Sequence, residues 1–512
     1  MNKRNLLRIV IVVGAASYLG YKHFHDHSNE PATKLAAPIA ADAKQFTMGT
    51  LDFKSCEIKQ KNSGATTMAF CAPFSVPENR DAQTGRKIDL RLALIKSRAS
   101  AADSDIVVFL AGGPGQAAVD TWPQIAGAFE PLLRHHHVLL LDQRGTGESN
   151  ALSCKRSEGV SEAGDDFDPE KVRQHTRDCL AIVEKKADPR YYTTTVASDD
   201  LEAIRVALGS PQFDLVGVSY GTRMAQQYLM RHPDGVRSVV LDSVAPTELA
   251  LGEDFAGTLE SALKANFSTC VQTPACQKAF GDPYANLFTL RDQLRAKPQD
   301  YSYRDPVTFK TDTMHVNQYN LAGLVRMFAY TPETAALLPL SITQGLHGDY
   351  TPLVGQDKIL TGDLSDLADN GMQMSVLCSE DADLLSPRPE DANALLGNLL
   401  IESMQAMCDV WPHGTRPADF HAPLKTDKPV LVLEGELDPV TPPRYGEQVV
   451  KNLSNARLIV AKGQGHNVIG RGCIPKVVED FVDDLKPKDL NAKCVDALGA
   501  MPAFISFNGA AP

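Results

Sequence analysis

Residues 213–222, with the sequence FDLVGVSYGT, decide how this chain of 512 residues folds. A mostly apolar run leads into the pattern Gly-x-Ser-x-Gly, and a pattern typical of an amphipathic helix continues to about Arg231. The two glycines allow a sharp turn from strand to helix, which strains the backbone at Ser219 and presents its hydroxyl at the end of the strand. We therefore predict that Ser219 is a nucleophile. The alternative is an ordinary glycine-rich turn whose serine only caps the helix.

Other apolar runs of similar length lie on both sides of this stretch. Continuous runs of this kind are typical of strands that are buried on both faces of a parallel sheet. The predicted parallel strands are residues 106–110, 138–141, 213–218, 236–241, 429–433 and 456–460, and residues 68–74 and 88–95 are predicted antiparallel strands that lead into the sheet. A helix between them is expected to start at Ser198 or Asp199 and to end at Leu208, before Gly209. Alternating strands and helices predict an α/β fold with a mostly parallel sheet.

The alternation stops between residues 246 and 424, where helical patterns and several prolines replace the strand rhythm. A gap of this length between two sheet strands indicates an inserted domain rather than a loop. We therefore predict a mainly helical cap on the core. The predicted organisation is a signal peptide or N-terminal anchor (1–27), a linker (28–49), the core in two parts (50–245 and 425–495), the helical cap (246–424) and a C-terminal tail (496–512).

A serine hydroxyl becomes an effective nucleophile only when a base removes its proton, so a histidine and an orienting acid are expected. In folds with this serine turn, the acid and then the histidine follow on loops after later strands. Asp438 follows the fifth predicted parallel strand and His466 follows the sixth. We predict that they form a catalytic triad with Ser219. Asp242, after the fourth strand, and Glu436 are the alternatives for the acid.

The negative charge that develops on a substrate carbonyl oxygen needs preorganised N–H donors. One predicted donor is the backbone N–H of Tyr220, the residue after the nucleophile. The other is expected from the loop AGGPG at residues 111–115, which follows the first predicted parallel strand. We predict Gly113 for this role, with Gly112 as the alternative.

The overall composition narrows the classes of function. Lys and Arg number 51 against 63 Asp and Glu, which gives a net charge of −12, and 43% of the residues are hydrophobic. Such a chain is typical of a soluble globular protein and excludes a disordered, collagen-like or polytopic membrane protein. The acidic balance also argues against a protein that binds nucleic acid.

The N-terminus resembles an export signal. Lys3 and Arg4 precede a mostly apolar run, residues 6–20, which Arg8 interrupts and which is short for a membrane-spanning helix. We therefore predict an exported protein, periplasmic or secreted. An uncleaved segment that anchors the chain to the membrane and a buried N-terminal helix are the alternatives.

The ten cysteines agree with export, because disulfides persist outside the reducing cytosol. The sequence alone does not fix their pairing. Their spacing favours local pairs, which would be Cys56–Cys71, Cys154–Cys179, Cys270–Cys276, Cys378–Cys408 and Cys473–Cys494. A metal site is the alternative, although no C-x-x-C pair occurs.

Several motifs in a fixed order resemble the proline iminopeptidase and tripeptidyl aminopeptidase group of α/β-hydrolases. They are AGGPG at 111–115, DQRGTG at 142–147, Asp199-Asp200-Leu201 leading to Leu208-Gly209, GVSYGT at 217–222, and Leu241-Asp242. The resemblance covers about residues 50–495. Prolyl-type members typically have His where this chain has Ala111, so the sequence is more similar to the secreted tripeptidyl branch.

The resemblance implies an aminopeptidase that holds the free ammonium group of a peptide with acidic side chains from the cap. Glu380 is the candidate for this anchor and Asp381 is the second choice; a solvated acidic pair or acids at a helix start are the alternative. The resemblance also implies that Asp142 and Arg144 brace loops behind the site.

No phosphate-binding loop or dinucleotide motif is present. His23, His25 and His27, and the run at 135–137, lack convincing acidic or cysteine ligands nearby, so we predict no metal and no cofactor. The sequence predicts a serine hydrolase that acts on a peptide or small acyl substrate. An esterase for small acyl or lactone substrates and a non-catalytic envelope binding protein are the alternatives, because fold and triad do not set the substrate. The oligomeric state is open.

Overall fold

The computed structural model describes residues 44–59, 66–82, 84–99, 105–154, 167–305, 309–357 and 370–510. The predicted signal or anchor at 1–27, with its three histidines, lies outside these ranges, as does most of the predicted linker. Within the described ranges, no helix is both long enough and apolar enough to cross a membrane.

One sheet of ten strands forms the centre of the structure, in the order β1-β2-β3-β4-β6-β5-β7-β8-β11-β12. Six neighbouring strands of this sheet pair in parallel: β6, β5, β7, β8, β11 and β12. The strands β1 to β4 pair antiparallel, and β4 joins β6 antiparallel. Their bounds are β1 Gln45–Met48, β2 Leu51–Lys59, β3 Thr66–Pro77, β4 Lys87–Ile95, β5 Ile106–Leu110, β6 His137–Leu141, β7 Phe213–Val218, β8 Val236–Asp242, β11 Val430–Gly435 and β12 Ala456–Ala461. Every predicted strand is confirmed, and the α/β fold with a mostly parallel sheet is confirmed with them.

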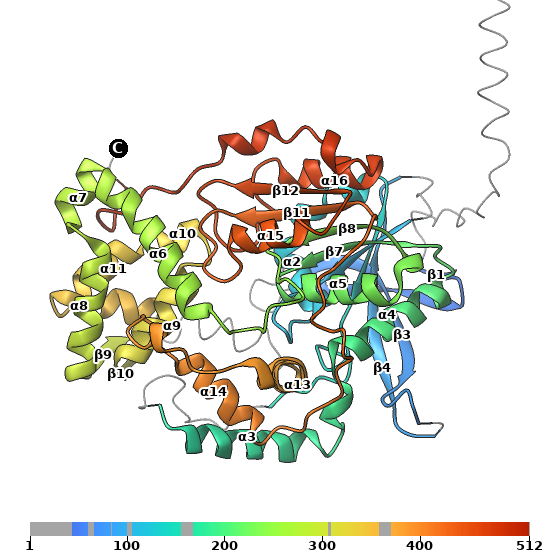
Figure 1. Ribbon diagram of the computed structural model, residues 1–512, viewed down its shortest axis with the longest axis horizontal. Coiled ribbons are helices and arrows are strands. Elements are labelled where there is room, and N and C mark those ends of the chain that lie inside the picture. The colour runs from blue at the N-terminus through green and yellow to red at the C-terminus, as the bar shows by residue number, and fades with distance from the viewer. Residues whose placement is uncertain are drawn as a thin grey trace, which may run out of the picture. The chain divides into compact units, whose positions relative to one another are not determined.

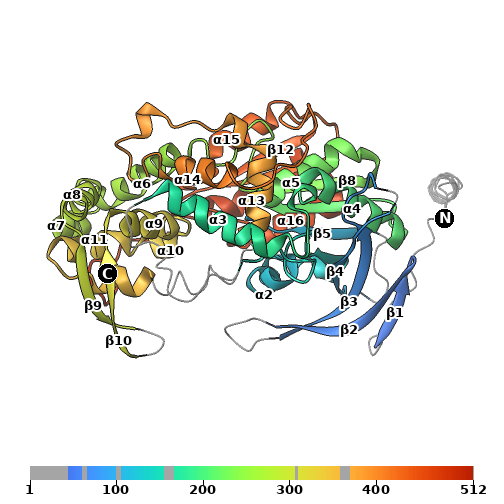
Figure 2. The same cartoon turned by 90° about the horizontal axis from the view of Figure 1, so that it is seen from below.

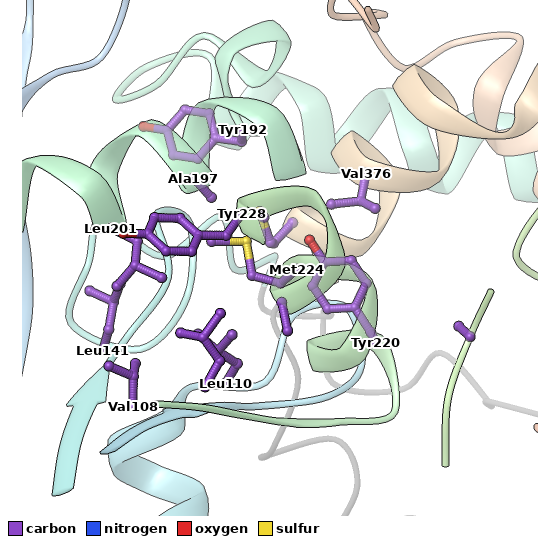
Figure 3. Packing of buried hydrophobic residues seen from close by; sticks show 14 of the residues in the cluster. Val108, Leu110, Leu141, Tyr192, Ala197, Leu201, Tyr220, Met224, Tyr228 and Val376 are labelled. Carbon is purple, nitrogen blue, oxygen red and sulfur yellow. The ribbon is translucent and has the colours of Figure 1, made fainter. Parts of the chain in front are cut away.

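Helices cover both faces of this sheet, which is why its central strands are buried throughout (Figure 1). Alternate residues of β5 join different cores: Val108 and Leu110 pack into one, and Val107 and Phe109 into the other. The first core also takes side chains from α3 (Pro169–Val183), α4 (Thr194–Leu208), α5 (Tyr220–Arg231) and α15 (Pro443–Val450), and the second from α2 (Ala118–Phe129) and α16 (Ile474–Asp484). Figure 3 shows Leu201, Tyr220, Met224 and Tyr228 packed in the first core.

The helix α4 begins one turn earlier than predicted. Thr193 is its N-cap, and its hydroxyl accepts the N–H of Val196 at 3.4 Å. Ser198, a predicted cap, lies inside the helix, where its hydroxyl donates to the carbonyl of Thr194. The predicted end is confirmed, because Gly209 has the left-handed φ of 67°.

The segment between β8 and β11 is mainly helical but differs from the prediction in two ways. It contains α6 Phe255–Gln272, α7 Pro274–Phe280, α8 Pro283–Ala296, α9 Gln318–Phe328, α10 Pro332–Ala335, α11 Leu338–Leu346, α13 Asn370–Glu380 and α14 Leu399–Cys408. It also contains an antiparallel pair, β9 Gln299–Arg304 and β10 Thr311–Val316, which lies apart from the large sheet (Figure 2). The helices α6, α8, α9 and α11 share a separate core, and α7 packs into a smaller cluster. By contrast, α13 and α14 pack into the first core of the sheet.

Both ends of the described chain are more ordered than predicted. Residues 45–48 were assigned to the linker, yet they form β1, because the Phe46 ring stacks on Phe53 at 5.2 Å and packs against Phe70. In the tail, Phe504 donates its N–H to the carbonyl of Ala336 and packs against the helices of the inserted segment. The alternating pattern before residue 50 was too short to be recognised as a strand.

The cysteines form five disulfides, and all five are the predicted local pairs. One of them, Cys378–Cys408, joins α13 to α14 and therefore fixes the helix that carries Glu380. No described cysteine is free.

Candidate active site

The serine turn joins β7 to α5 as predicted. Ser219 has φ 57° and ψ −123°, a conformation in the region that side chains rarely adopt. A Cβ on Gly221 would lie 2.0 Å from the carbonyl oxygen of Leu110, and a Cβ on Gly217 would lie 2.4 Å from that of Gly221. Both positions of the motif therefore require glycine. The result is a half-exposed Ser219 at the carboxyl end of a buried strand.

In the structure, Ser219, His466 and Asp438 are joined by two consecutive hydrogen bonds. The Nε2 atom of His466 lies 3.0 Å from the Ser219 hydroxyl, and its Nδ1 atom lies 2.7 Å from an Asp438 carboxylate oxygen. The other Asp438 oxygen accepts the backbone N–H groups of Val440 and Thr441, both at 2.8 Å. Because Asp438 accepts at Nδ1, the imidazole carries its proton there and leaves Nε2 free to accept from serine.

The two alternative acids hold loops and do not touch the imidazole. Asp242 accepts the backbone N–H groups of Val468 and Ile469, both at 2.9 Å, and burial raises its pKa to about 6. Glu436 accepts the N–H of Gly463 at 2.8 Å. Both carboxylates therefore shape the loop before or after His466 and leave its ring to Asp438.

Of the candidate oxyanion donors, Tyr220 follows Ser219 in the chain and Gly112 packs against its side chain. Tyr220 is the first residue of α5, so its N–H has no partner inside the helix. A Cβ on Gly112 would lie 3.2 Å from the Cβ of Ser219, whereas a Cβ on Gly113 would meet the backbone of Gly115 and Gln116. Gly112 is therefore packed directly against the nucleophile, and both glycines stay candidates for the second donor.

Glu380 ends α13 and Asp381 follows it, and both are buried, so the alternative of a solvated pair is wrong. Asp381 does precede the short helix Ala382–Leu384, as the other alternative expected, but its side chain does not cap that helix. Glu380 accepts the N–H and the hydroxyl of Thr194 at 2.6 and 2.9 Å, and Asp381 accepts from Arg223 at 2.7 Å. Burial raises the pKa of Glu380 to about 7. One Asp381 oxygen has no hydrogen-bond partner. Two carboxylates thus face the guanidinium of Arg223, and the His421 ring lies 3.7 Å from the Asp381 oxygen that has no hydrogen bond.

A hydrogen-bonded path joins this acidic pair to the residue after the nucleophile. The Thr194 hydroxyl, bound to Glu380, lies 2.7 Å from the hydroxyl of Tyr220, which also accepts from Gln143. The α13 side chain Val376 and the Tyr220 ring belong to the same core (Figure 3). Thr194 and Arg223 were not predicted from the sequence. No local motif marks them, because their partners lie in distant segments of the chain.

Two further residues of the site were missed. The Thr441 hydroxyl donates to Asp438 at 2.9 Å and lies 3.2 Å from Nδ1 of His466. Tyr330, which follows α9, accepts the backbone N–H of His466 at 2.7 Å and places its ring edge-on to the imidazole. The spacing of Thr441, three residues after the predicted acid, was the only available signal.

Arg144, Asp142 and two histidines of the run at 135–137 have structural contacts. Arg144 is fully buried and binds Asp200 through two nitrogens, at 2.6 and 2.7 Å, and Asp142 accepts the N–H of Val119. His136 binds Asp483, and His137 accepts from Ser97. In the part of the chain that the structure describes, no three His, Cys, Asp or Glu side chains are grouped to hold a metal ion.

A sheet of this kind with a serine, a histidine and an acid after the carboxyl ends of its parallel strands is typical of a hydrolase. A family model described as alpha/beta hydrolase fold matches residues 105–471. The chain therefore belongs to the α/β-hydrolase family.

Relatives at modest identity agree with the predicted resemblance, which is confirmed. "Serine protease Hip1" of Mycobacterium tuberculosis is 24% identical over 83% of this chain and 87% of its own length. "Tripeptidyl aminopeptidase" of Streptomyces lividans is 26% identical over 43% of each chain. "Proline iminopeptidase" of Neisseria gonorrhoeae is 26% identical over 28% of this chain and 35% of its own. The chain thus spans most of Hip1 and less than half of the other two.

Proposed function

We propose that this protein is a serine peptidase that cleaves peptides from their free N-termini through an acyl-enzyme. The observation that carries the proposal is the hydrogen-bonded sequence of Ser219, His466 and Asp438 at 3.0 and 2.7 Å. Relatives named as a serine protease and as a tripeptidyl aminopeptidase support the choice of a peptide substrate.

In the proposed first step, the Ser219 oxygen forms a bond to the substrate carbonyl carbon and His466 Nε2 takes the hydroxyl proton. Asp438 stabilises the imidazolium that results. The N–H groups of Tyr220 and of Gly113, or its neighbour Gly112, donate to the carbonyl oxygen as it becomes negative. The bond to the leaving nitrogen then breaks, and that nitrogen takes the proton from His466.

In the second step, the oxygen of a water molecule bonds to the acyl carbon and the water gives a proton to His466. The bond between the acyl carbon and the Ser219 oxygen then breaks, the acid is released, and His466 returns the proton to Ser219. The partial exposure of Ser219 leaves room for substrate and water, whereas the base and the acid are buried. Burial strengthens the interaction between the imidazolium and Asp438, because few water molecules compete for either group.

The buried acidic pair supports the choice of a free N-terminus. Glu380 and Asp381 outnumber the one guanidinium that contacts both, that of Arg223 at 3.7 and 2.7 Å. A substrate ammonium group could donate to the Asp381 oxygen that has no hydrogen-bond partner, and a buried carboxylate selects strongly for a cation.

The test compares free peptides with their N-acetylated forms and identifies the released fragment by mass spectrometry. Free peptides are expected to be cleaved about 10- to 100-fold faster in kcat/KM, because acetylation removes one charge-assisted hydrogen bond. Equal cleavage of both forms would indicate an endopeptidase or an esterase and would contradict the aminopeptidase. The mass of the fragment measures how many residues are released.

Changing Glu380→Gln is expected to raise KM for free-amine peptides by about 10-fold or more, because the charge is lost while the bonds to Thr194 are mostly kept. Burial raises the pKa of Glu380 to about 7, so the wild type should also lose affinity for these peptides as the pH falls below about 7. Steady-state kinetics between pH 6 and 8.5 measure both effects, and the variant should not show the acidic loss.

Two controls separate anchoring from structural damage. A simple acyl ester without an amine should be hydrolysed at the wild-type rate by Glu380→Gln. Changing the exposed Glu402→Gln, on the neighbouring helix α14, should leave both substrates unaffected. Equal loss on peptide and ester in Glu380→Gln would contradict the anchor role.

We also propose that the protein is exported. Five disulfides within one chain favour an oxidising compartment. The residues expected to direct export, 1–27, lie outside the described ranges.

A further inference from the structure

Arg326 has an unusual environment for an arginine of the inserted segment. Three arginines there form ion pairs, Arg291 with Asp292, Arg388 with Asp391 and Arg416 with Asp383. Two others donate hydrogen bonds, Arg295 to Gln318 and Arg304 to the carbonyl of Phe309. Arg326 is half-buried in the last turn of α9, and within the described ranges its side chain forms no ion pair or hydrogen bond. Its contacts are two aromatic rings: its guanidinium carbon lies 4.8 Å from the ring centre of Phe255 and 5.7 Å from that of Tyr330.

Both rings belong to residues that adjoin the catalytic loops. The Tyr330 ring lies 5.1 Å from the imidazole of His466, and its carbonyl accepts the His466 N–H. Phe255 begins α6, and Thr258, one turn further, donates its hydroxyl to the carbonyl of Pro439, the residue after the triad acid. Arg326 is therefore fixed beside the loops that carry the base and the acid.

The chemistry of the proposed reaction tells which part of a substrate would reach this arginine. His466 must give its proton to the leaving nitrogen, so the leaving group lies on the imidazole side of the scissile bond. Tyr330 packs against that imidazole, and Arg326 contacts the same Tyr330 ring. Two ring contacts, of 5.1 and 5.7 Å, separate the imidazole from the guanidinium carbon. Two or three extended residues span such a distance at about 3.3–3.6 Å each.

A guanidinium held between aromatic rings is suited to bind a carboxylate. Stacking on the rings orients its planar donors and partly removes water, while leaving the N–H groups of its edge available. A carboxylate then gains two parallel charge-assisted hydrogen bonds. With no acidic side chain paired to it in the described structure, Arg326 keeps its charge available for a ligand.

We propose that Arg326 binds the free C-terminal carboxylate of a short peptide, on the leaving-group side of the scissile bond. The inference rests on the proposed function, because it uses His466 as the donor to the leaving nitrogen. It makes the substrate class short oligopeptides whose leaving group is about two or three residues long. A guanidinium at one end and an acidic pair at the other would then measure the length of the peptide.

The test uses pairs of free-amine peptides that differ only in a C-terminal acid or amide. Wild type should cleave the acids about 10- to 100-fold faster in kcat/KM. Arg326→Gln should lose this preference while its rate on the amides stays within about twofold, and Arg326→Lys should keep part of it, because ammonium is a single point charge. A peptide p-nitroanilide has no carboxylate on its leaving group and should be cleaved equally by all three.

Arg304→Gln is the matched control. Arg304 also lies over an aromatic ring, that of Phe309, but it ends the exposed strand β9. This variant should keep the full preference for acids.

An arm without variants covers the case in which Arg326→Gln does not fold. Dipeptide acids should inhibit wild-type hydrolysis of the p-nitroanilide at least 10-fold more strongly than dipeptide amides. Equal cleavage of acids and amides by wild type, equal inhibition by both dipeptides, or a preference that persists in Arg326→Gln would each overturn the proposal. Any of these results leaves the triad standing, because hydrolysis itself would still depend on Ser219.

Discussion

Changing Ser219→Ala is expected to lower kcat by about 10⁶-fold, which is the effect typical of losing the nucleophile of a serine triad. The hydroxyl is the one group that forms the acyl-enzyme, and the imidazole 3.0 Å away has no other described hydroxyl on its Nε2 side. Stopped assays with a peptide p-nitroanilide measure the loss. The variant should also fail to react with a fluorescent organophosphonate, which modifies activated serines.

A neighbouring serine provides the control for this result. Ser243 follows β8, also has a positive φ of 59°, and accepts the N–H of Asn467 beside the catalytic histidine. Ser243→Ala should still be labelled by the phosphonate at one site. Labelling that persists in Ser219→Ala would show that another residue is the nucleophile and would reject the proposed triad.

Residues that act through local pattern could be predicted from the sequence. Ser219, Asp438 and His466 each follow an apolar strand within a few residues, and parallel strands bring their carboxyl ends to one edge of the sheet. Their convergence therefore followed once the strands were recognised. The disulfides were predictable for a similar reason, because each joins cysteines 6 to 30 residues apart.

Residues that act across long separations could not be predicted in this way. Thr194 contacts Glu380 although the two are 186 positions apart in the sequence, and the backbone of Tyr330 contacts that of His466. No pattern in the sequence encodes such pairs, since each depends on how the inserted segment packs on the core. The strand β9 was missed for a different reason: its sequence QDYSYR buries only Tyr303 and lacks the apolar alternation of a sheet strand.

The burial of Glu380 depends both on the local sequence and on a contact with a distant segment. The helix α13 ends in Ser379-Glu380 and Asp381 follows it, a sequence polar enough to suggest a solvated end. Arg223, in the first turn of α5, supplies the buried positive charge that makes the burial of Glu380 tolerable, and the Cys378–Cys408 disulfide holds α13 in place. The acidic character of the site was thus visible in the sequence, whereas its dry surroundings were not.

Changing Asp438→Asn is expected to lower kcat by about 10⁴-fold while the protein stays folded. The asparagine oxygen can still accept the N–H groups of Val440 and Thr441, so its NH₂ group must face Nδ1 of His466. The imidazole then has to carry its proton on Nε2, the tautomer that cannot accept the Ser219 proton. Peptide hydrolysis measures the loss, and an unchanged melting temperature excludes unfolding as its cause.

Asp242→Asn is the matched comparison, because both residues are buried carboxylates after neighbouring strands. The Asp242 carboxylate accepts two backbone N–H groups of the loop after His466, one with each oxygen. Asparagine can accept only one of these two hydrogen bonds. Losing one such bond costs on the order of 1 kcal/mol, so activity should fall by about 10-fold or less. The assignment of the acid rests on the difference between these variants. If Asp242→Asn loses as much activity as Asp438→Asn, the assignment of Asp438 as the triad acid is rejected, and Asp242 becomes the acid.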